Sequence, residues 1–170
     1  FIKEVEGYKT TGYVPKKDGK VLGKSGVTIA SGFDLGQRNI QDLVGLPEEV
    51  VTKLAPYLSL KGKDADAIAK NLKINTDEAD LINEFSKQQT MSRLSRQWMG
   101  TTGTNFESLP SNKQTAIASV AFQYGDLAKK TPNFWQYATS GNWDSVKREL
   151  NDFKDKYPTR RKKEAALLDD

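Results

Sequence analysis

The spacing of the apolar residues changes at Gly36, and this change limits the possible folds more than any other feature. Upstream, residues 25–37 carry three glycines, and Val27, Ile29 and Phe33 alternate with small residues, which predicts a short twisted hairpin or meander. Downstream, apolar residues recur at helical spacing to the end of the chain. The sequence therefore predicts an α+β fold that is mainly helical, with a small β lobe and a larger helical lobe.

Capping signals and glycines divide the downstream part into helices. We expect helical segments at residues 40–44, 47–58, 65–72, 75–98, 111–124, 134–137, 142–153 and 159–168. Asn75–Glu78 and Ser111–Gln114 both have the pattern of a capping box, in which the first and fourth residues bond to each other's backbone N–H groups. The helix from Asn75 is expected to join a lobe of about residues 1–75 to one of about 76–170. Residues 8–24 are predicted to be a loop or an irregular hairpin arm.

Cysteine and histidine are both absent, which removes several kinds of active site. A chain without them has no disulfide, no zinc site of the usual nitrogen and sulfur type, no cysteine nucleophile and no Ser-His-Asp triad. A hydrolase of this composition must work with carboxylates or with Lys, Tyr, Ser or Thr. We therefore expect no metal and no other cofactor.

The charge balance suits an anionic polymer as partner. The formal net charge is +4 and the isoelectric point is near 9.1, which is too mild to indicate nucleic acid. No run of about 18 apolar residues occurs, so we expect no membrane-spanning segment. Because the sequence starts at Phe1, without an initiator Met or an export signal, we expect either a processed piece or, in preference, the C-terminal part of a longer protein.

Three residues are suited to acid–base chemistry by their local setting. Thr28 and Asp34 are predicted to project from a strand and from its end, although they are also consistent with a plain β-former and a turn or helix-capping residue. Glu6 precedes Gly7 at the predicted C-terminus of a helix over residues 1–6, where the helix dipole raises the pKa of a carboxyl group. A protonated carboxyl and a second carboxylate are what glycosidic hydrolysis needs, and that reaction requires no metal.

Four blocks in the same order resemble a known family. They are Glu6-Gly7, the strand Val27-Thr-Ile-Ala-Ser-Gly, the run Ala118-Ser-Val-Ala-Phe-Gln-Tyr-Gly125 and the tail Tyr157-Pro-Thr-Arg-Arg-Lys-Lys-Glu-Ala165. Together they look like the phage-type lysozymes. The stretch Gly-Phe-Asp-Leu-Gly-Gln at 32–37 and the tail motif resemble more closely the pesticin branch, the muramidase domains of bacteriocins, secreted effectors and some phage endolysins.

This resemblance implies a two-lobed lysozyme fold that hydrolyses the β-1,4 bond between N-acetylmuramic acid and N-acetylglucosamine in peptidoglycan. Glu6 then matches the general acid, Thr28 the hydroxyl that holds the attacking water, and Asp34 the second carboxylate. In ordinary phage lysozymes the aspartate precedes the threonine, where this chain has Leu22, so Asp18 is the alternative second carboxylate. A water between sugar and carboxylate implies a single displacement with inversion.

Two further residues match family positions. Gln123 corresponds to a cleft residue whose amide can bond to the N-acetyl groups of the sugar, although an amide at a helix end is often an ordinary polar group. Arg160 corresponds to the arginine that pairs with the catalytic glutamate; Arg161 is its alternative, and a solvated basic helix would explain both. Because such a pair lowers the pKa of Glu6, burial must supply the upward shift. The helical spacing of Trp98, Phe134, Trp135 and Trp143 favours core packing over sugar stacking.

The expected partner is therefore the peptidoglycan glycan strand, met by a monomer in the bacterial periplasm. Delivery by a secretion system, as a bacteriocin or as a phage endolysin would all serve, and a periplasmic immunity or inhibitor protein is a further possible partner. The alternative function is a non-catalytic module with a degenerate lysozyme fold that binds cell wall or nucleic acid, since basic charge and aromatic residues suit binding as well. Glu6 separates the two, because only an enzyme needs an acid at that position.

Overall fold

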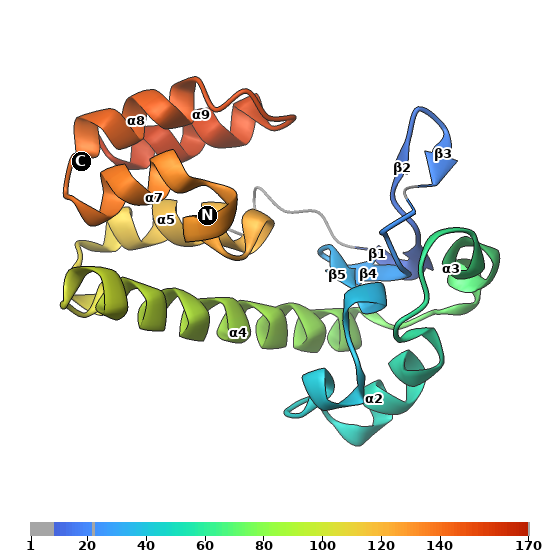
Figure 1. Ribbon diagram of the computed structural model, residues 1–170. Helices are drawn as coiled ribbons and strands as arrows, with labels where there is room; N and C mark the ends of the chain where they lie inside the picture. Colours follow the sequence, from blue (N-terminus) through green and yellow to red (C-terminus); the bar gives the residue numbers. More distant parts are fainter. Residues whose placement is uncertain (1–8, 22, 170) are drawn as a thin grey trace. The chain divides into compact units, whose positions relative to one another are not determined.

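The computed structural model describes residues 9–21 and 23–169, which form two compact units. One unit ends at Ser86 and the other begins at Lys87, so the boundary lies inside the longest helix, α4 (Thr76–Thr102) (Figure 1). Each unit has its own hydrophobic core. The predicted mainly helical α+β fold with a long connecting helix is confirmed.

A three-stranded antiparallel sheet forms the β part of the first unit (Figure 1). Its strands are β1 (Lys9–Tyr13), β4 (Thr28–Ala30) and β5 (Phe33–Asp34), in the order β1-β4-β5. A separate two-stranded ribbon pairs β2 (Lys16–Lys17) with β3 (Lys20–Val21). The predicted strand segment is confirmed, with all of β4 buried at the centre of the sheet.

The prediction of a loop or an irregular hairpin arm for residues 8–24 agrees with the β2–β3 ribbon, but it missed β1, which is an edge strand of the three-stranded sheet. Its lysine and glycine content hides it from pattern analysis. Close packing explains why residue 12 is a glycine. The N–H of Gly12 donates to the carbonyl of Leu72 at 2.8 Å, and a Cβ at Gly12 would lie 2.3 Å from the carbonyl oxygen of Ala69. Close packing against a later helical turn, rather than local propensity, places this strand.

Helical segments make up most of the rest of the described chain. Those of the first unit are η1 (Leu35–Gln37), η2 (Ile40–Leu43), α2 (Glu48–Leu54), η3 (Ala55–Tyr57), α3 (Gly62–Ile68) and η4 (Ala69–Asn71). After α4 follow η5 (Phe106–Ser108), α5 (Ser111–Tyr124), α6 (Leu127–Lys130), α7 (Pro132–Thr139), α8 (Trp143–Asn151) and α9 (Pro158–Leu167).

One predicted capping box is confirmed and the other is wrong. Asn75 accepts from the N–H of Glu78 at 2.8 Å, and the Glu78 carboxylate accepts from the N–H of Asn75 at 3.0 Å. Ser111, by contrast, is already the first residue of α5 and makes no capping bond. The side-chain amide of Gln114 instead donates to the carbonyl oxygens of Glu107 and Leu109, so it stabilises the preceding loop.

Opposite ends of α4 contribute to different cores. Ala79 and Ile82 pack with the sheet and the small helices of the first unit, and Leu94 and Trp98 pack with α5 to α9 in the second. The central helix predicted for the larger lobe is α5, whose residues 116–121 are all buried. Trp98, Phe134 and Trp135 are core residues, as their spacing predicts, and Trp143 packs against the same core while its ring also contacts the ammonium of Lys113.

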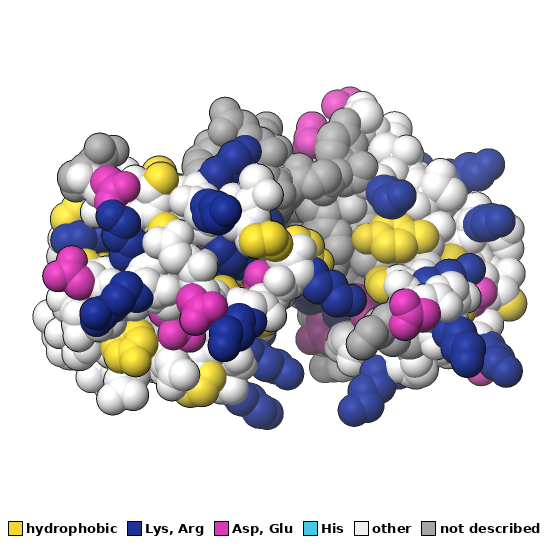
Figure 2. Space-filling model, turned by 90° about the horizontal axis from the view of Figure 1, so that it is seen from above, with side chains coloured by type: hydrophobic (Ala, Val, Ile, Leu, Met, Phe, Trp, Pro, Cys, Tyr) yellow, Lys and Arg dark blue, Asp and Glu magenta, His cyan; other side chains and the backbone are white. Residues whose placement is uncertain are grey.

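Charge is divided unequally between the units. Within residues 87–169, 14 Lys and Arg stand against 8 Asp and Glu, a difference of +6, whereas residues 9–86 carry 11 of each. Figure 2 shows basic side chains distributed over the visible surface with acidic ones between them. In the part of the chain that the structure describes, no helix has the length and apolar character needed to cross a membrane.

Candidate active site

Gly26 joins the two candidate catalytic residues of the first unit. Its N–H donates to Asp34 Oδ1 at 3.1 Å, and its carbonyl accepts the Thr28 hydroxyl at 3.1 Å. Thr28 on β4 lies directly opposite Asp34 on β5. Because directly opposed residues of an antiparallel pair project from the same face, the sheet brings these two side chains together.

A close contact between two glycines makes this arrangement possible. A Cβ on Gly26 would lie 2.3 Å from the Cα of Gly36, and one on Gly36 would lie 2.6 Å from the Cα of Gly26. Both would also clash with the carbonyl of Leu60. The N–H of Gly36 completes the cradle, donating to Asp34 Oδ1 at 2.8 Å, so two backbone amides hold one carboxylate oxygen.

Asp34 also caps the helical turn η1 through its bond to Gly36. The capping role considered from the sequence is therefore present, but it uses Oδ1 alone. Oδ2 makes no hydrogen bond to any described residue, which leaves this oxygen able to accept a proton from water. The carboxylate is thus fixed at one oxygen and available at the other.

Thr28 is buried, with 3% of its surface exposed. Its single hydroxyl proton is used by the Gly26 carbonyl, so Oγ1 can bond to a further group only as an acceptor. A water that donates one O–H to Oγ1 keeps its oxygen lone pairs for a nucleophilic attack. The structure therefore restricts how Thr28 can act on water to this one orientation.

Asp18, the alternative second carboxylate, lies elsewhere in the same unit. It occupies the two-residue turn between β2 and β3, where it and Gly19 have φ of 54° and 77°. Asp and Gly are favoured at these positions of a hairpin turn, and the side chain is exposed. The hairpin turn alone therefore explains why an aspartate occupies position 18.

Glu6 and the helix predicted for residues 1–6 lie outside the described residues.

In the second unit, Arg160 is held between α5 and its own helix. Its Nε donates to Ser119 Oγ at 3.2 Å and its Nη2 to the Ser119 carbonyl at 2.7 Å. Glu164, one turn further along α9, lies 3.4 Å from Nε. The guanidinium and this carboxylate are both buried, so the side chain of Arg160 is fixed rather than solvated.

Arg161 is bonded to two acidic side chains. Its Nη1 donates to both oxygens of Glu164, and its Nε donates to Asp155 at 3.0 Å. The same Asp155 oxygen accepts the hydroxyl of Tyr124 at 2.8 Å. Two carboxylates are therefore bonded to Arg161, while its buried Nη2 has no hydrogen-bond partner among the described residues.

Burial shifts the acid–base properties of this buried network. Desolvation raises the pKa of Glu164 to about 7, against the opposing effect of Arg161 and Arg160. Burial, together with the nearby Asp155, raises the pKa of Tyr124 to about 12. Burial alone would raise the pKa of Asp155, but hydrogen bonds from Tyr157 and Tyr124 and the charge of Arg161 hold it below its ordinary value.

Gln123 lies in the last turn of α5, four residues after Ser119, and therefore on the same face of the helix. Its Oε1 is buried and accepts no hydrogen bond from the described residues. A buried amide oxygen without a donor is costly, and a ligand N–H would satisfy it.

Sequence reasoning proposed roles for Arg160 and Gln123 but assigned none to Ser119, Asp155 or Glu164. The spacing of Glu164, three and four residues after two arginines, was a usable signal for ion pairing on one helix face. Ser119 gave no such signal in the sequence, because a small polar residue within an apolar run is common.

No group of His, Cys, Asp and Glu among the described residues could hold a metal ion. Comparison with protein families gives one match: the model described as "Pesticin: Bacterial toxin homologue of phage lysozyme, C-term" covers residues 1–144. No individual curated protein matches the chain. The match includes Glu6, Thr28, Asp34 and Gln123 and ends before α9.

Proposed function

Because the chain belongs to the pesticin family of phage-lysozyme-like bacterial toxin domains, we propose that it is a peptidoglycan muramidase. Its substrate is the β-1,4 bond between N-acetylmuramic acid and N-acetylglucosamine. Cleavage of this bond weakens the cell wall and lyses the bacterium, so the enzyme acts in the periplasm. The family supports the general class of activity, and the hydrogen bonds of Thr28 and Asp34 support the roles proposed for these two residues.

In the proposed reaction Glu6 is the general acid and protonates the glycosidic oxygen as the bond breaks. A water attacks the anomeric carbon from the opposite face of the sugar. This water donates one O–H to Thr28 Oγ1 and loses its other proton to Asp34 Oδ2. The water oxygen that bonds to the anomeric carbon has no covalent link to the protein. The product therefore has the inverted α configuration.

The single observation that carries this proposal is the pair of hydrogen bonds at Gly26. One backbone residue fixes both the hydroxyl of Thr28 and one oxygen of Asp34, on opposed strands. Fixed polar groups of this kind do not need to reorganise during the reaction, which is the main requirement for electrostatic catalysis. Asp18 has no comparable support.

Gln123 and Arg160 have binding and supporting roles in this proposal. The buried Oε1 of Gln123 accepts the N–H of an N-acetyl group. Arg160, fixed by Ser119 and Glu164, has the supporting role of the arginine that the family pattern pairs with the general acid. Neither residue exchanges a proton with the substrate.

The test is the release of reducing sugar from purified peptidoglycan in the presence of a chelator, by the wild type, Asp34→Asn and Asp18→Asn. We expect full wild-type activity without metal. Asp34→Asn should lower kcat by at least about 100-fold, the usual scale for a general base, and Asp18→Asn should be nearly silent. Folding of each variant is checked by thermal unfolding.

Three results would contradict the proposal. Activity that is lost to the chelator would exclude a mechanism based on carboxylates alone. Loss in Asp18→Asn but not in Asp34→Asn would transfer the role of base to Asp18. Binding of peptidoglycan without any hydrolysis would favour the non-catalytic cell-wall module.

A further inference from the structure

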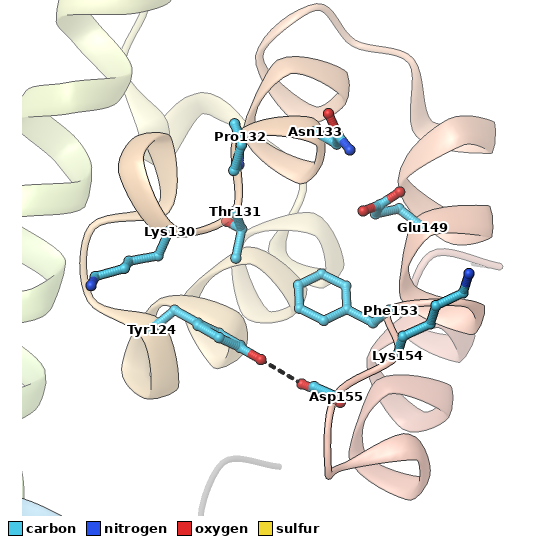
Figure 3. A pocket seen from close by; sticks show the side chains of 9 residues that line it. All are labelled: Tyr124, Lys130, Thr131, Pro132, Asn133, Glu149, Phe153, Lys154 and Asp155. Carbon is cyan, nitrogen blue, oxygen red and sulfur yellow. Dashed lines mark hydrogen bonds between the residues drawn. The ribbon is translucent and has the colours of Figure 1, made fainter.

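A pocket of about 290 Å³ lies within the second unit, and none of its lining residues is among the candidate site residues (Figure 3). Tyr124 and Phe153 form its aromatic floor, and their ring centroids are 5.7 Å apart. Glu149 on α8 and Asn133 on α7 stand on its walls, with Lys154 beside them. Tyr124 directly follows Gln123, so α5 contributes both to this pocket and to the candidate site.

The polar groups of the pocket are of two kinds. Asp155 is already satisfied, because Tyr124, Arg161 and the N–H of Tyr157 all donate to it. The carboxylate of Glu149, in contrast, makes no hydrogen bond or ion pair with the described residues, and Figure 3 shows it directed toward the space above the Phe153 ring. A half-buried carboxylate without a donor is a binding group that the fold does not use.

Lys154 forms part of the rim of this pocket. Its backbone has φ of 62°, in the left-handed region that non-glycine residues rarely adopt. It follows α8, and together with its chain neighbours Phe153 and Asp155 it lines the pocket.

The charges limit what the pocket can bind. A simple cation would be opposed by Lys154 and by Arg161, whose guanidinium already lies 5.2 Å from the centre of the Phe153 ring. A simple anion would be opposed by Glu149. A neutral sugar meets neither penalty: its hydroxyls can donate to Glu149 and bond to Asn133, and its apolar ring face can pack on Phe153.

We infer that this pocket is a saccharide subsite for one N-acetylhexosamine unit. The inference rests on the proposed function only for the identity of the sugar, since the glycan strand consists of such units. The pocket holds the sugar through Glu149, Asn133 and Phe153, and it extends glycan binding beyond Gln123.

The experiment is a titration of the whole ¹⁵N-labelled protein with N-acetylglucosamine, followed by NMR. A monosaccharide has no bond to cleave, so binding is measured without turnover. We expect saturable shifts of the amide signals of Asn133, Glu149 and Lys154. Glu149→Gln should weaken binding roughly tenfold, as expected when a charge-assisted hydrogen bond is replaced by a neutral one. Asp144→Asn, an exposed acidic change on the same helix, is the matched control.

Asn133→Ala is a second variant. The Asn133 side chain is exposed, so its removal does not disturb a hydrophobic core, and the change should also weaken sugar binding. The inference is overturned if the sugar shifts no pocket signal, or if neither variant changes the affinity. Shifts in this pocket with alanyl-alanine but not with the sugar would assign it to a zwitterionic peptide instead. An inactive protein that still binds the sugar here would contradict the muramidase proposal alone.

Discussion

Glu164 is a buried carboxylate that two arginines do not fully stabilise. Burial raises its pKa to about 7, so between the pKa of an unfolded glutamate, 4.5, and about 7 the folded protein binds the extra proton. The stabilisation of the folded protein by this proton is fully present below pH 4.5, and it is lost as the pH rises through about 7. The shift corresponds to about 3 kcal/mol of unfolding free energy.

Glu164→Gln should therefore abolish this fall in stability between pH 4.5 and 7.5. Urea unfolding of the wild type and the variant at several pH values measures it, and only the difference between the two curves matters, because other groups titrate in both. Glu49→Gln, an exposed change on α2, should leave the wild-type curve unaltered. Parallel curves for wild type and Glu164→Gln would mean that Glu164 is ionised throughout this range.

Thr28 permits a sharper test of the proposed water. Thr28→Val keeps the β-branched shape in the strand but removes both the bond to the Gly26 carbonyl and the acceptor for water. We expect a loss of about 1 kcal/mol of stability from the buried hydrogen bond and a much larger loss in kcat than in KM. Thr28→Ser should recover part of kcat.

Proton NMR of freshly released products from the wild type completes this test. An initial α-anomer agrees with direct attack by water. An initial β-anomer would indicate a covalent intermediate and would leave Thr28 without the role assigned to it.

At the scale of elements, the contact between Gly26 and Gly36 fixes the turn that carries Asp34. Gly26→Ala places a methyl group 2.3 Å from the Cα of Gly36, against backbone that cannot move aside. We expect a cost of about 1–3 kcal/mol or more and loss of the amide cradle, hence of activity. Gly100→Ala is the control: it has open space inside α4 and should stabilise the protein by about 0.5–1 kcal/mol. Thermal unfolding and peptidoglycan hydrolysis together check both variants, and an active, stable Gly26→Ala would contradict the proposed cradle.

The elements that could be predicted are those set by local chemistry. The capping box at Asn75 and the buried run of α5 depend on neighbours three or four residues away, so the sequence displays them. β1 was missed because it is held by Leu72, far along the chain, and the box at Ser111 failed because Gln114 found carbonyl partners in the preceding loop.

The candidate site divides in the same way. The pairing of Thr28 with Asp34 follows from a short hairpin and could be expected. Their common attachment to Gly26 could not, because it depends on the contact with Gly36 and on the carbonyl of Leu60. Likewise, the spacing of Glu164 indicated an ion pair, but its burial depends on how α9 packs against α5, which no local pattern shows.

At the scale of the whole molecule, the excess positive charge belongs to residues 87–169, with +6, while residues 9–86 are balanced. Peptidoglycan carries carboxylates, so the second unit should supply most of the electrostatic attraction to the cell wall. This attraction should weaken between about 0.01 M and about 1 M salt, as the Debye length falls from about 30 Å to about 3 Å.

Two double variants separate local charge from net charge. Arg96→Glu with Lys162→Glu changes exposed residues of the second unit, and Lys63→Glu with Lys70→Glu changes exposed residues of the first by the same total charge. Binding to purified sacculi is measured by co-sedimentation, with Asp34→Asn present throughout to prevent digestion. At low salt the first pair should weaken binding roughly tenfold, equivalent to about 1.4 kcal/mol, and the second pair by much less. At high salt the difference should vanish, because both sets of charges are then screened. Equal losses at low salt would show that only the net charge matters, and binding that is insensitive to salt would show that contacts other than these charges hold the protein on the wall.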